Sequence, residues 1–309
     1  MELTIDSSSS NKNSSAIDIT GICSRGVLSF KIGSYLSEKT TRRFITNFKG
    51  MLENIINFHK NSTSSTRQLP IGVEPYFQFC SVIVDGTSSS IPTLFVLPPG
   101  EGGAESYFGN IAQNLGGFNL IIFNNFYLAM NKPDTCSFEQ LAKMYLKYIR
   151  ELQPHGPYHF LGWSFGGLLS LEISKQLTNS GEKIGTLTMI DSYFNVIKAC
   201  HDIGLPKEKY VIDRINYAYT PGESCLKNFV ENSNKIALFK ATRINEKYDS
   251  DPQFLLYEYY RNSKYNNLDT LIDPGSWNLL YLDSESHNSW VHNKSQVDKI
   301  CDFLVSNIM

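Results

Sequence analysis

The sequence lacks three features that would point to particular classes of protein. It has no surplus of positive charge, because 28 Lys and Arg residues stand against 30 Asp and Glu, for a formal net charge of -2. Nucleic acids and anionic membranes therefore gain no electrostatic attraction, and neither is expected as a partner. No apolar run approaches the ~20 residues of a membrane span. The Ser- and Asn-rich N-terminus also has no apolar stretch typical of a secretory leader.

Paired cysteines are absent as well. The six cysteines are scattered without a Cys-x-x-Cys pair, in a chain of 309 residues that is too large to need disulfide bonds. This usage favours a reducing, cytoplasmic compartment, and we predict no metal site and no cofactor of the chain's own. What the sequence does have is 41% apolar and 13% aromatic residues, enough for one large packed domain and a smaller accessory segment.

The N-terminal part of the chain differs in pattern from the rest. Residues 1–16 are rich in Ser and Asn and are predicted to be disordered. Apolar residues alternate over 28–32, which predicts a strand, and recur at spacings of three and four over 40–58, which predicts a helix. Residues 61–70 form a polar linker, and we expect a second domain over 71–309.

Short apolar runs alternate with longer amphipathic stretches from residue 71 onward. The runs predict strands at 81–84, 93–97, 120–123, 158–161, 186–190, 235–240 and 279–282. The amphipathic stretches predict helices near 106–115, 137–152 and 167–179. Such alternation with short loops indicates an α/β protein with a mainly parallel sheet covered on both faces.

The run from Tyr158 to Gly167 predicts a buried strand, a tight turn at Ser164 and a helix. Gly162 and Gly166 flank the serine because side chains in so tight a turn would collide with neighbouring backbone. This turn, a nucleophile elbow, holds the hydroxyl at a helix N-terminus, where the helix dipole favours negative charge. The bare Gly-x-Ser-x-Gly pattern is weak, but its strand and helix context predicts an α/β-hydrolase fold.

A serine hydroxyl needs a base within hydrogen-bond reach and a carboxylate that orients the base. Asp191 follows the next predicted parallel strand, so we expect its side chain at the same sheet edge as Ser164. The alternative is that Asp191 only caps the following turn. In this fold the base comes last in the chain. We predict His287, just past the run 279–282, in preference to His292, which is expected inside the following helix.

The other histidines are predicted to take no part in catalysis. His155 and His159 flank the elbow strand, and the alternation of the strand places His159 on a sheet face. His201 belongs to the start of an insertion, and His59 lies outside the domain.

An acyl-transfer site also needs two N–H donors aimed at the developing oxyanion. One is expected from the backbone of Phe165, the residue after the nucleophile. The second is expected from Gly100, in the glycine-rich loop after an earlier strand. A flexible turn or a phosphate cradle is the alternative for this loop, although its spacing fits neither the Gly-x-Gly-x-x-Gly nor the P-loop pattern.

With elbow, acid and base placed, residues 92–309 resemble the integrated (type I) thioesterase domains of nonribosomal peptide and polyketide synthases. The resemblance is carried by Gly-Trp-Ser-Phe-Gly-Gly around Ser164, Gly181-Glu-Lys-Ile-Gly-Thr-Leu, Ile190-Asp-Ser-Tyr193 and Pro98-Pro-Gly-Glu-Gly-Gly. The acid follows the strand next to the elbow, whereas most hydrolases of this fold carry it one strand later. The chain departs from the family around the base, with Glu285-Ser286 for Gly-Asp and Ser289-Trp290 for aliphatic residues.

The resemblance implies a chain-releasing thioesterase. Such an enzyme transfers a peptidyl or polyketidyl chain from the phosphopantetheine of a carrier protein to Ser164 and releases it by hydrolysis or macrocyclisation. The resemblance also implies a helical lid at about 195–234, for which an ordinary surface insertion is the alternative. Residues 17–60 resemble the last strand and helix of a condensation- or epimerization-type domain of nonribosomal peptide synthetases, through Ile19-Thr-Gly and Gly26-Val-Leu-Ser-Phe-Lys-Ile.

Three other functions stay open at this point. The chain could be a discrete editing thioesterase that clears mis-primed carriers, or a carboxylesterase for small soluble esters. It could also be a docking module without catalysis, in which residues 26–58 recruit a partner. The N-terminal segment is either the remnant of a preceding domain or a docking element, and its apolar helix face must be covered by something.

Overall fold

The computed structural model describes residues 2–6, 17–24, 27–34, 37–61, 80–84, 91–100, 105–127, 130, 136–204, 235–242, 252–271, 275, 277–284, 287 and 289–309. The chain divides into two compact units, Met1–Phe77 and Gln78–Met309. The predicted linker, from residue 62 on, and most of the predicted lid, from 205 to 234, lie outside the described residues.

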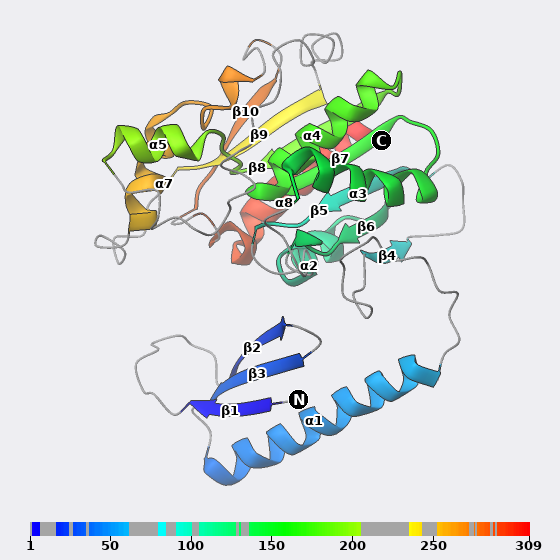
Figure 1. Ribbon diagram of the computed structural model, residues 1–309, viewed down its shortest axis with the longest axis vertical. Helices are drawn as coiled ribbons and strands as arrows, with labels where there is room; N and C mark the ends of the chain where they lie inside the picture. Colours follow the sequence, from blue (N-terminus) through cyan, green and yellow to red (C-terminus); the bar gives the residue numbers. More distant parts are fainter. Residues whose placement is uncertain are drawn as a thin grey trace. The chain divides into compact units, whose positions relative to one another are not determined.

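The first unit is a three-stranded sheet followed by a helix (Figure 1). Its strands are β1 (Glu2–Asp6), β2 (Ile17–Ser24) and β3 (Val27–Ser34), in the order β1-β3-β2. β1 is parallel and β2 antiparallel to β3. The prediction of disorder over 1–16 is therefore wrong for residues 2–6, and the one predicted strand is one of three. Leu3 and Ile5 alternate with polar residues, and pairing with β3 supplies backbone partners that composition does not reveal.

The helix of the first unit, α1 (Glu38–Asn61), includes the whole stretch predicted over 40–58. The ring of Phe48 lies edge-on to Phe30 of β3, with centroids 5.1 Å apart, and stacks on Phe44 at 6.0 Å. The sheet and the helix thus share an aromatic contact, and part of the apolar helix face is covered within this unit.

The second unit contains a seven-stranded sheet in the order β10-β9-β8-β7-β5-β6-β4 (Figure 1). The strands are β4 (Cys80–Val84), β5 (Thr93–Leu97), β6 (Asn119–Phe123), β7 (Tyr158–Trp163), β8 (Ile184–Ile190), β9 (Ile236–Ala241) and β10 (Asn278–Leu282). All neighbours are parallel except β4 and β6. Every predicted strand of this domain is present, and the prediction of a mainly parallel α/β sheet is confirmed.

Helices cover both faces of this sheet. They are α2 (Glu105–Asn114), α3 (Phe138–Leu152), α4 (Phe165–Asn179) and α8 (Lys294–Ile308). α3 packs on α4, and α2 packs on α8 (Figure 1). Leu94 and Val96 of β5 join a buried cluster with side chains of α2 and α8. Phe95, between them, contacts Phe123 and Phe160 instead, as the alternation of a strand between two helical layers requires.

Two further helices belong to the segment that follows β8. They are α5 (Val196–Asp202) and α7 (Pro252–Asn262), and they share a small buried cluster that includes Cys200, Leu256 and Tyr260. α5 occupies the start of the predicted lid interval, 195–234. The helical character of the rest of that interval stays a prediction.

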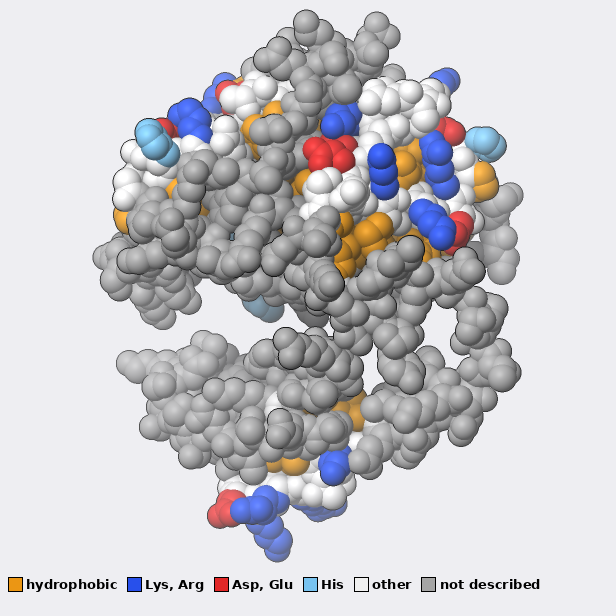
Figure 2. Space-filling view, viewed as in Figure 1, with side chains coloured by type: hydrophobic (Ala, Val, Ile, Leu, Met, Phe, Trp, Pro, Cys, Tyr) orange, Lys and Arg blue, Asp and Glu red, His pale blue; other side chains and the backbone are white. Residues whose placement is uncertain are grey.

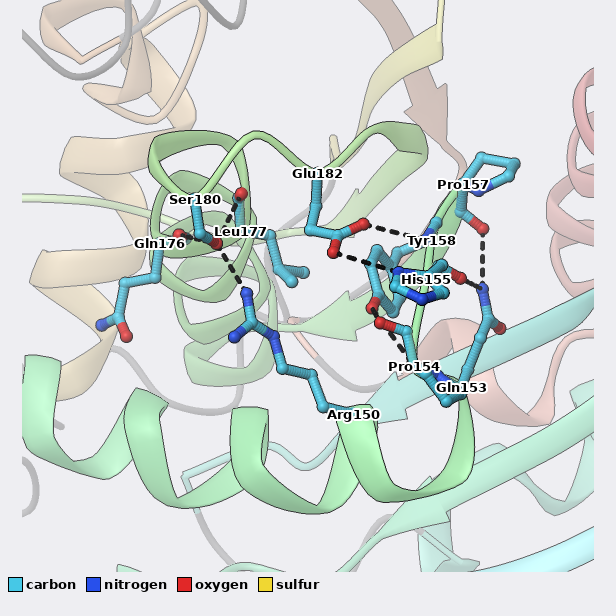
Figure 3. A network of polar contacts seen from close by, with 11 residues as sticks. Arg150, Gln153, Pro154, His155, Pro157, Tyr158, Gln176, Leu177, Ser180 and Glu182 are labelled. Atoms are coloured by element: carbon cyan, nitrogen blue, oxygen red, sulfur yellow. Dashed lines mark hydrogen bonds and ion pairs between the residues drawn. The ribbon is translucent and has the colours of Figure 1, made fainter.

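The amino ends of β7 and β8 are joined by a network of polar contacts (Figure 3). The hydroxyl of Tyr158 donates to the carbonyl oxygens of Gln153 and Pro154, each at 3.0 Å. The backbone N–H of Gly156 donates to Oε2 of Glu182 at 3.1 Å. Beside it, the imidazole Nδ1 of His155 lies 3.6 Å from Oε1 of the same carboxylate. Hydrogen bonds within residues 153–158, together with contacts from His155 and Gly156 to Glu182, thus hold this edge of the sheet together.

The described surface of the second unit mixes charges of both signs. Figure 2 shows Lys and Arg side chains beside Asp and Glu side chains, with apolar groups between them. Exposed ion pairs within one helix include Lys198 with Asp202 and Lys294 with Asp298. Within the described ranges, none of the helices is long and apolar enough to cross a membrane.

Candidate active site

Ser164 lies in the sharp turn between Trp163, the last residue of β7, and Phe165, the first of α4. Its φ of 55° and ψ of -121° form a combination that costs a residue with a side chain ~1–3 kcal/mol. The surroundings hold it there, because its N–H donates to the carbonyl of Ile190 at 2.8 Å and its carbonyl accepts from the N–H of Gly167 at 3.1 Å. The turn thus fixes a half-buried hydroxyl at the start of a helix.

The two glycines predicted to flank the serine occupy positions where no side chain fits. A Cβ on Gly162 would lie 2.2 Å from the carbonyl carbon and oxygen of Gly166. A Cβ on Gly166 would lie 2.4 Å from the carbonyl oxygen of Leu97 and 2.6 Å from that of Pro98. Both positions therefore require glycine. The second contact also shows that the first turn of α4 packs directly on the end of β5.

Asp191 directly follows β8, the neighbour of β7 in the sheet, so it lies at the same edge as Ser164. Its Oδ2 is 2.6 Å from Nδ1 of His287, although the two residues are 96 positions apart. The side chains are only 13% and 12% exposed, and a hydrogen bond is electrostatically stronger in such a setting than in water. The predicted acid and the predicted base are thus in contact.

The imidazole of His287 contacts two aromatic rings. Its centroid is 5.2 Å from that of Trp163 and 5.7 Å from that of Tyr193. Trp163 precedes the nucleophile, and Tyr193 follows the acid by two residues. Both ends of the predicted site therefore contribute a ring that restricts the orientation of the imidazole.

Residues on both sides of His287 make contacts that hold its loop in place. The hydroxyls of Ser284 and Ser289 lie 2.7 Å apart across it. Trp290 is fully buried and contacts Trp163 and Phe108 at centroid distances of 5.7 and 6.3 Å. The residue that follows Ser289 thus places a large ring in the hydrophobic core next to the loop.

The second carboxylate oxygen of Asp191 has partners that the sequence did not suggest. Its Oδ1 accepts from the backbone N–H of Ala241 at 3.2 Å and from Nδ2 of Asn266 at 3.3 Å. The neighbouring Asn266-Asn267 pair signals a turn in the sequence. Turn chemistry does not say which distant side chain such a residue contacts, so this partner could not be found beforehand.

The two predicted oxyanion donors belong to segments at the ends of β5 and β7, and α4 packs on β5. Phe165 begins α4, and Gly100 lies in the loop after β5. The buried amide of Asn125 donates from Nδ2 to the carbonyl oxygens of Pro99 at 2.9 Å and Gly100 at 3.1 Å, and so fixes this part of the loop. Residues 101–104 lie outside the described residues. Sequence reasoning also missed Asn125, which carries no motif.

Other histidines of the second unit occupy different elements. His292 ends the 3₁₀ helix Ser289–His292 before α8, and is exposed, so its expected place inside the following helix is wrong. His159 is buried on the sheet with Nδ1 3.2 Å from the hydroxyl of Thr186, and burial lowers its pKa to about 4. His201 lies exposed on α5. Among the described residues, no group of three or more His, Cys, Asp and Glu could hold a metal ion.

This arrangement is a serine on a nucleophile elbow with an Asp–His pair at the same edge of an α/β-hydrolase sheet. Comparison with known proteins gives the family: the thioesterase domain profile matches residues 92–295. The chain belongs to the thioesterase domain family, whose members are serine hydrolases that act on thioesters.

Two curated relatives match almost the whole chain. The N-(5-amino-5-carboxypentanoyl)-L-cysteinyl-D-valine synthase of Penicillium rubens is 42% identical over 296 residues, which is 94% of this chain and 8% of that protein. The synthase of the same name from Amycolatopsis lactamdurans is 39% identical over 296 residues, 96% of this chain and 8% of that protein. The chain thus spans a small part of the length of these relatives.

A solved structure shares the fold. A crystal structure of the NocB thioesterase domain, in covalent complex with a fluorophosphonate nocardicin G analog, matches with a TM-score of 0.53. The match has 16% sequence identity and covers 75% of this chain and 100% of that chain.

Proposed function

We propose that this chain is a chain-releasing thioesterase that takes a peptidyl chain from the phosphopantetheine thiol of a carrier protein and releases it with water. The observation that carries the proposal is the buried 2.6 Å contact between Asp191 and His287 at the sheet edge where Ser164 begins a helix. In this proposal Ser164 is the nucleophile, His287 the base and Asp191 the residue that orients the base.

Acylation uses the two nitrogens of His287 differently. Since Asp191 binds Nδ1, Nε2 is the nitrogen that accepts the proton of Ser164 Oγ as this oxygen attacks the thioester carbonyl. The backbone N–H groups of Phe165 and Gly100 are the proposed donors to the oxyanion. When the carbon–sulfur bond breaks, the proton passes from Nε2 to the departing pantetheine thiolate.

Release completes the cycle. Water attacks the ester carbonyl, gives its proton to Nε2, and the proton returns to Ser164 Oγ as the free acid leaves. The name of the two relatives denotes a linear tripeptide ending in valine. This supports a peptidyl chain and water as acceptor, over a polyketidyl chain and a nucleophile within the chain, which would give a ring.

The partner in this reaction is a peptidyl carrier protein or domain, which brings the phosphopantetheine. The chain itself then needs no cofactor, because the proposed steps move only protons and an acyl group. The cytoplasm is the proposed compartment, where the free thiols of Cys80, Cys136, Cys200 and Cys301 would stay reduced.

The experiment that tests this function is intact-protein mass spectrometry after incubation with a fluorophosphonate probe and, separately, with a peptidyl-pantetheine thioester. The wild type should gain one probe adduct and release a product with the mass of the linear acid. Ser164→Ala should gain no adduct. Ser306→Ala, which removes an exposed hydroxyl on α8, should react like the wild type.

The other outcomes separate the alternatives. A released product lighter by one water would mean cyclisation. Faster turnover of acetyl-carrier than of peptidyl-carrier would favour an editing thioesterase, and turnover of small esters without any carrier-bound thioester would favour a carboxylesterase. Absence of every adduct would contradict catalysis and favour the docking module.

A further inference from the structure

We propose that Asn266 is a positioning residue for the catalytic acid: it holds Oδ1 of Asp191 so that Oδ2 faces the imidazole of His287. The inference rests on the proposed function, since it assumes that Asp191 and His287 act in acyl transfer. Asn266 lies 75 residues after Asp191, in the turn that follows α7, and nothing in the family motif points to it.

The contacts divide the carboxylate of Asp191 between two tasks. Oδ1 accepts from Nδ2 of Asn266 at 3.3 Å and from the N–H of Ala241 at 3.2 Å, while Oδ2 lies 2.6 Å from Nδ1 of His287. Nδ2 of Asn266 also donates to the carbonyl of Ser192 at 3.0 Å. With donors on one oxygen, the carboxylate cannot rotate about its terminal torsion without losing them, so the other oxygen stays in line with the imidazole.

The orientation of the Asn266 amide follows from its surroundings. The side chain is 1% exposed. Turned the other way, its oxygen would face Oδ1 of Asp191 and the carbonyl of Ser192, which are both acceptors. In the observed orientation Oδ1 of Asn266 is buried without a partner among the described residues. A buried acceptor without a partner lowers stability, so this amide serves the acid at a cost to the fold.

The backbone fixes Asn266 independently of its side chain. Its φ is 54°, in the left-handed region that asparagine tolerates. Its N–H donates to the carbonyl of Ser263 at 3.3 Å. The buried ammonium of Lys240, on β9, binds the carbonyl oxygens at the end of α7, which are those of Tyr260, Arg261 and Ser263. β9 therefore supports the acid twice: directly through Ala241, and indirectly through the turn that carries Asn266.

The test compares Asn266→Gly with Asn267→Gly in the full chain. Both residues have left-handed backbone, with φ of 54° and 62°, and glycine keeps that conformation while it removes the side chain. The Asn267 side chain contacts Phe194 and Ser263 and makes no hydrogen bond to Asp191 among those described. Turnover of the peptidyl-pantetheine thioester gives kcat and KM, and the proton on Nδ1 of His287 is followed by its downfield NMR signal.

Asn266→Gly should lower kcat about 10- to 100-fold, the range expected for one hydrogen bond to a charged group. KM should change little, and the His287 signal should shift or broaden. Asn267→Gly should keep the wild-type kcat and the wild-type His287 signal, and its melting temperature should be similar to that of Asn266→Gly. Equal kcat values and equal signals in the two variants would overturn the proposal. A lower melting temperature of Asn266→Gly with wild-type kcat would assign the residue a structural role only.

A further variant and a further measurement test the proposal separately from the proposed function. Asn266→Asp retains the size and left-handed tolerance of the residue but directs an oxygen at the carboxylate, so it should lose at least as much activity; wild-type kcat here would contradict the proposal. If the wild type is labelled by the fluorophosphonate but does not turn over the thioester, the proposed function fails. The rate constant of labelling and the NMR signal then still test Asn266.

Discussion

The two edges of the sheet at which β7 and β8 begin and end differ in structure. At the carboxyl ends of the strands, Ser164 and Asp191 both have positive φ, 55° and 41°, and their side chains belong to the proposed site. At the amino ends, the residues around Tyr158 and Glu182 form the hydrogen-bonded network of Figure 3. The backbone of these strands is therefore strained at the carboxyl ends and held by hydrogen bonds at the amino ends.

The two ends of helix α4 differ in the same way as the ends of the strands. The N-terminal turn of α4 starts from a strained residue without a side-chain cap. Its C-terminal turn is tied back, because Nη2 of Arg150 on α3 donates to Oγ of Ser180 at 2.6 Å, and Oγ of Ser180 donates to the carbonyl of Leu177 at 2.9 Å (Figure 3). Strained residues persist only where surrounding structure over-determines them. Substitutions at the carboxyl-end edge should therefore lower kcat more than stability, and substitutions at the amino-end edge should lower stability more than kcat.

The largest expected effect is at the carboxyl-end edge. Asp191→Asn should lower kcat about 10⁴-fold, because an amide in place of the carboxylate no longer holds the imidazole with Nε2 as the acceptor. The free energy of unfolding should change by much less than the barrier to acyl transfer. Steady-state turnover of the thioester and urea unfolding measure the two quantities.

Asp298→Asn is the control for this change, since Asp298 pairs only with Lys294 on the surface of α8 in the described contacts. Exposed pairs of this kind contribute ~0–1 kcal/mol, and kcat should stay at the wild-type value. A small loss of kcat in Asp191→Asn would argue that the acid does not act through His287, and the contrast between the edges would fail.

The opposite signature is expected from Gly156→Ala at the amino-end edge. A Cβ there would lie 2.4 Å from the carbonyl oxygen of Lys183 and 3.2 Å from the ring of Tyr158, so the loop must shift and the bond to Glu182 is strained. We expect a loss of about 3 kcal/mol in the free energy of unfolding, as for an overpacked site. The kcat per folded molecule should be unchanged.

Gly109→Ala is the matched control for this substitution. Gly109 lies within α2, and a Cβ on it meets nothing within 4 Å. Alanine is the better helix former, so the stability should rise by up to ~1 kcal/mol. If Gly156→Ala also lowered the kcat per folded molecule, the amino-end edge would affect catalysis as well as stability, and the contrast between the two edges would fail.

The sequence was sufficient for the parts of this protein that depend on local pattern. Alternating apolar runs predicted every strand of the large sheet, and the glycines around Ser164 predicted the elbow, since both follow from contacts between residues close in the chain. Asp191 and His287 were reached through the order of elements in the fold. The structure brings them into contact.

What the sequence missed depends on contacts between distant residues. β1 was missed because a short strand in a Ser-rich context is stabilised by its pairing with β3, which composition does not show. Asn125 and Asn266 were missed because an asparagine carries the same signal in any turn. Only the fold decides that one binds the carbonyl of Gly100 and the other the carboxylate of Asp191.

The last prediction concerns the dependence of stability on pH at the amino-end edge, where β7 carries His159. Burial lowers the pKa of this histidine from 6.5 to about 4, and the positive charge of Lys235 acts in the same direction. In the unfolded chain His159 is therefore protonated below about pH 6.5, whereas in the folded chain it is protonated only below about pH 4. Stability is lost as the pH falls through this window, by about 2 kcal/mol at pH 5.

Urea unfolding at pH 7.5 and pH 5 measures this loss, and His159→Gln removes the titrating group while it keeps a hydrogen-bonding side chain beside Thr186. Carboxylates elsewhere titrate in both proteins, so their effects cancel in the difference between wild type and variant. The wild type should lose about 2 kcal/mol more than the variant between the two pH values. Equal losses would mean that the fold admits a proton at His159. In that case the amino-end edge would be open to charge and water, and its contrast with the Ser164 edge would rest on backbone geometry alone.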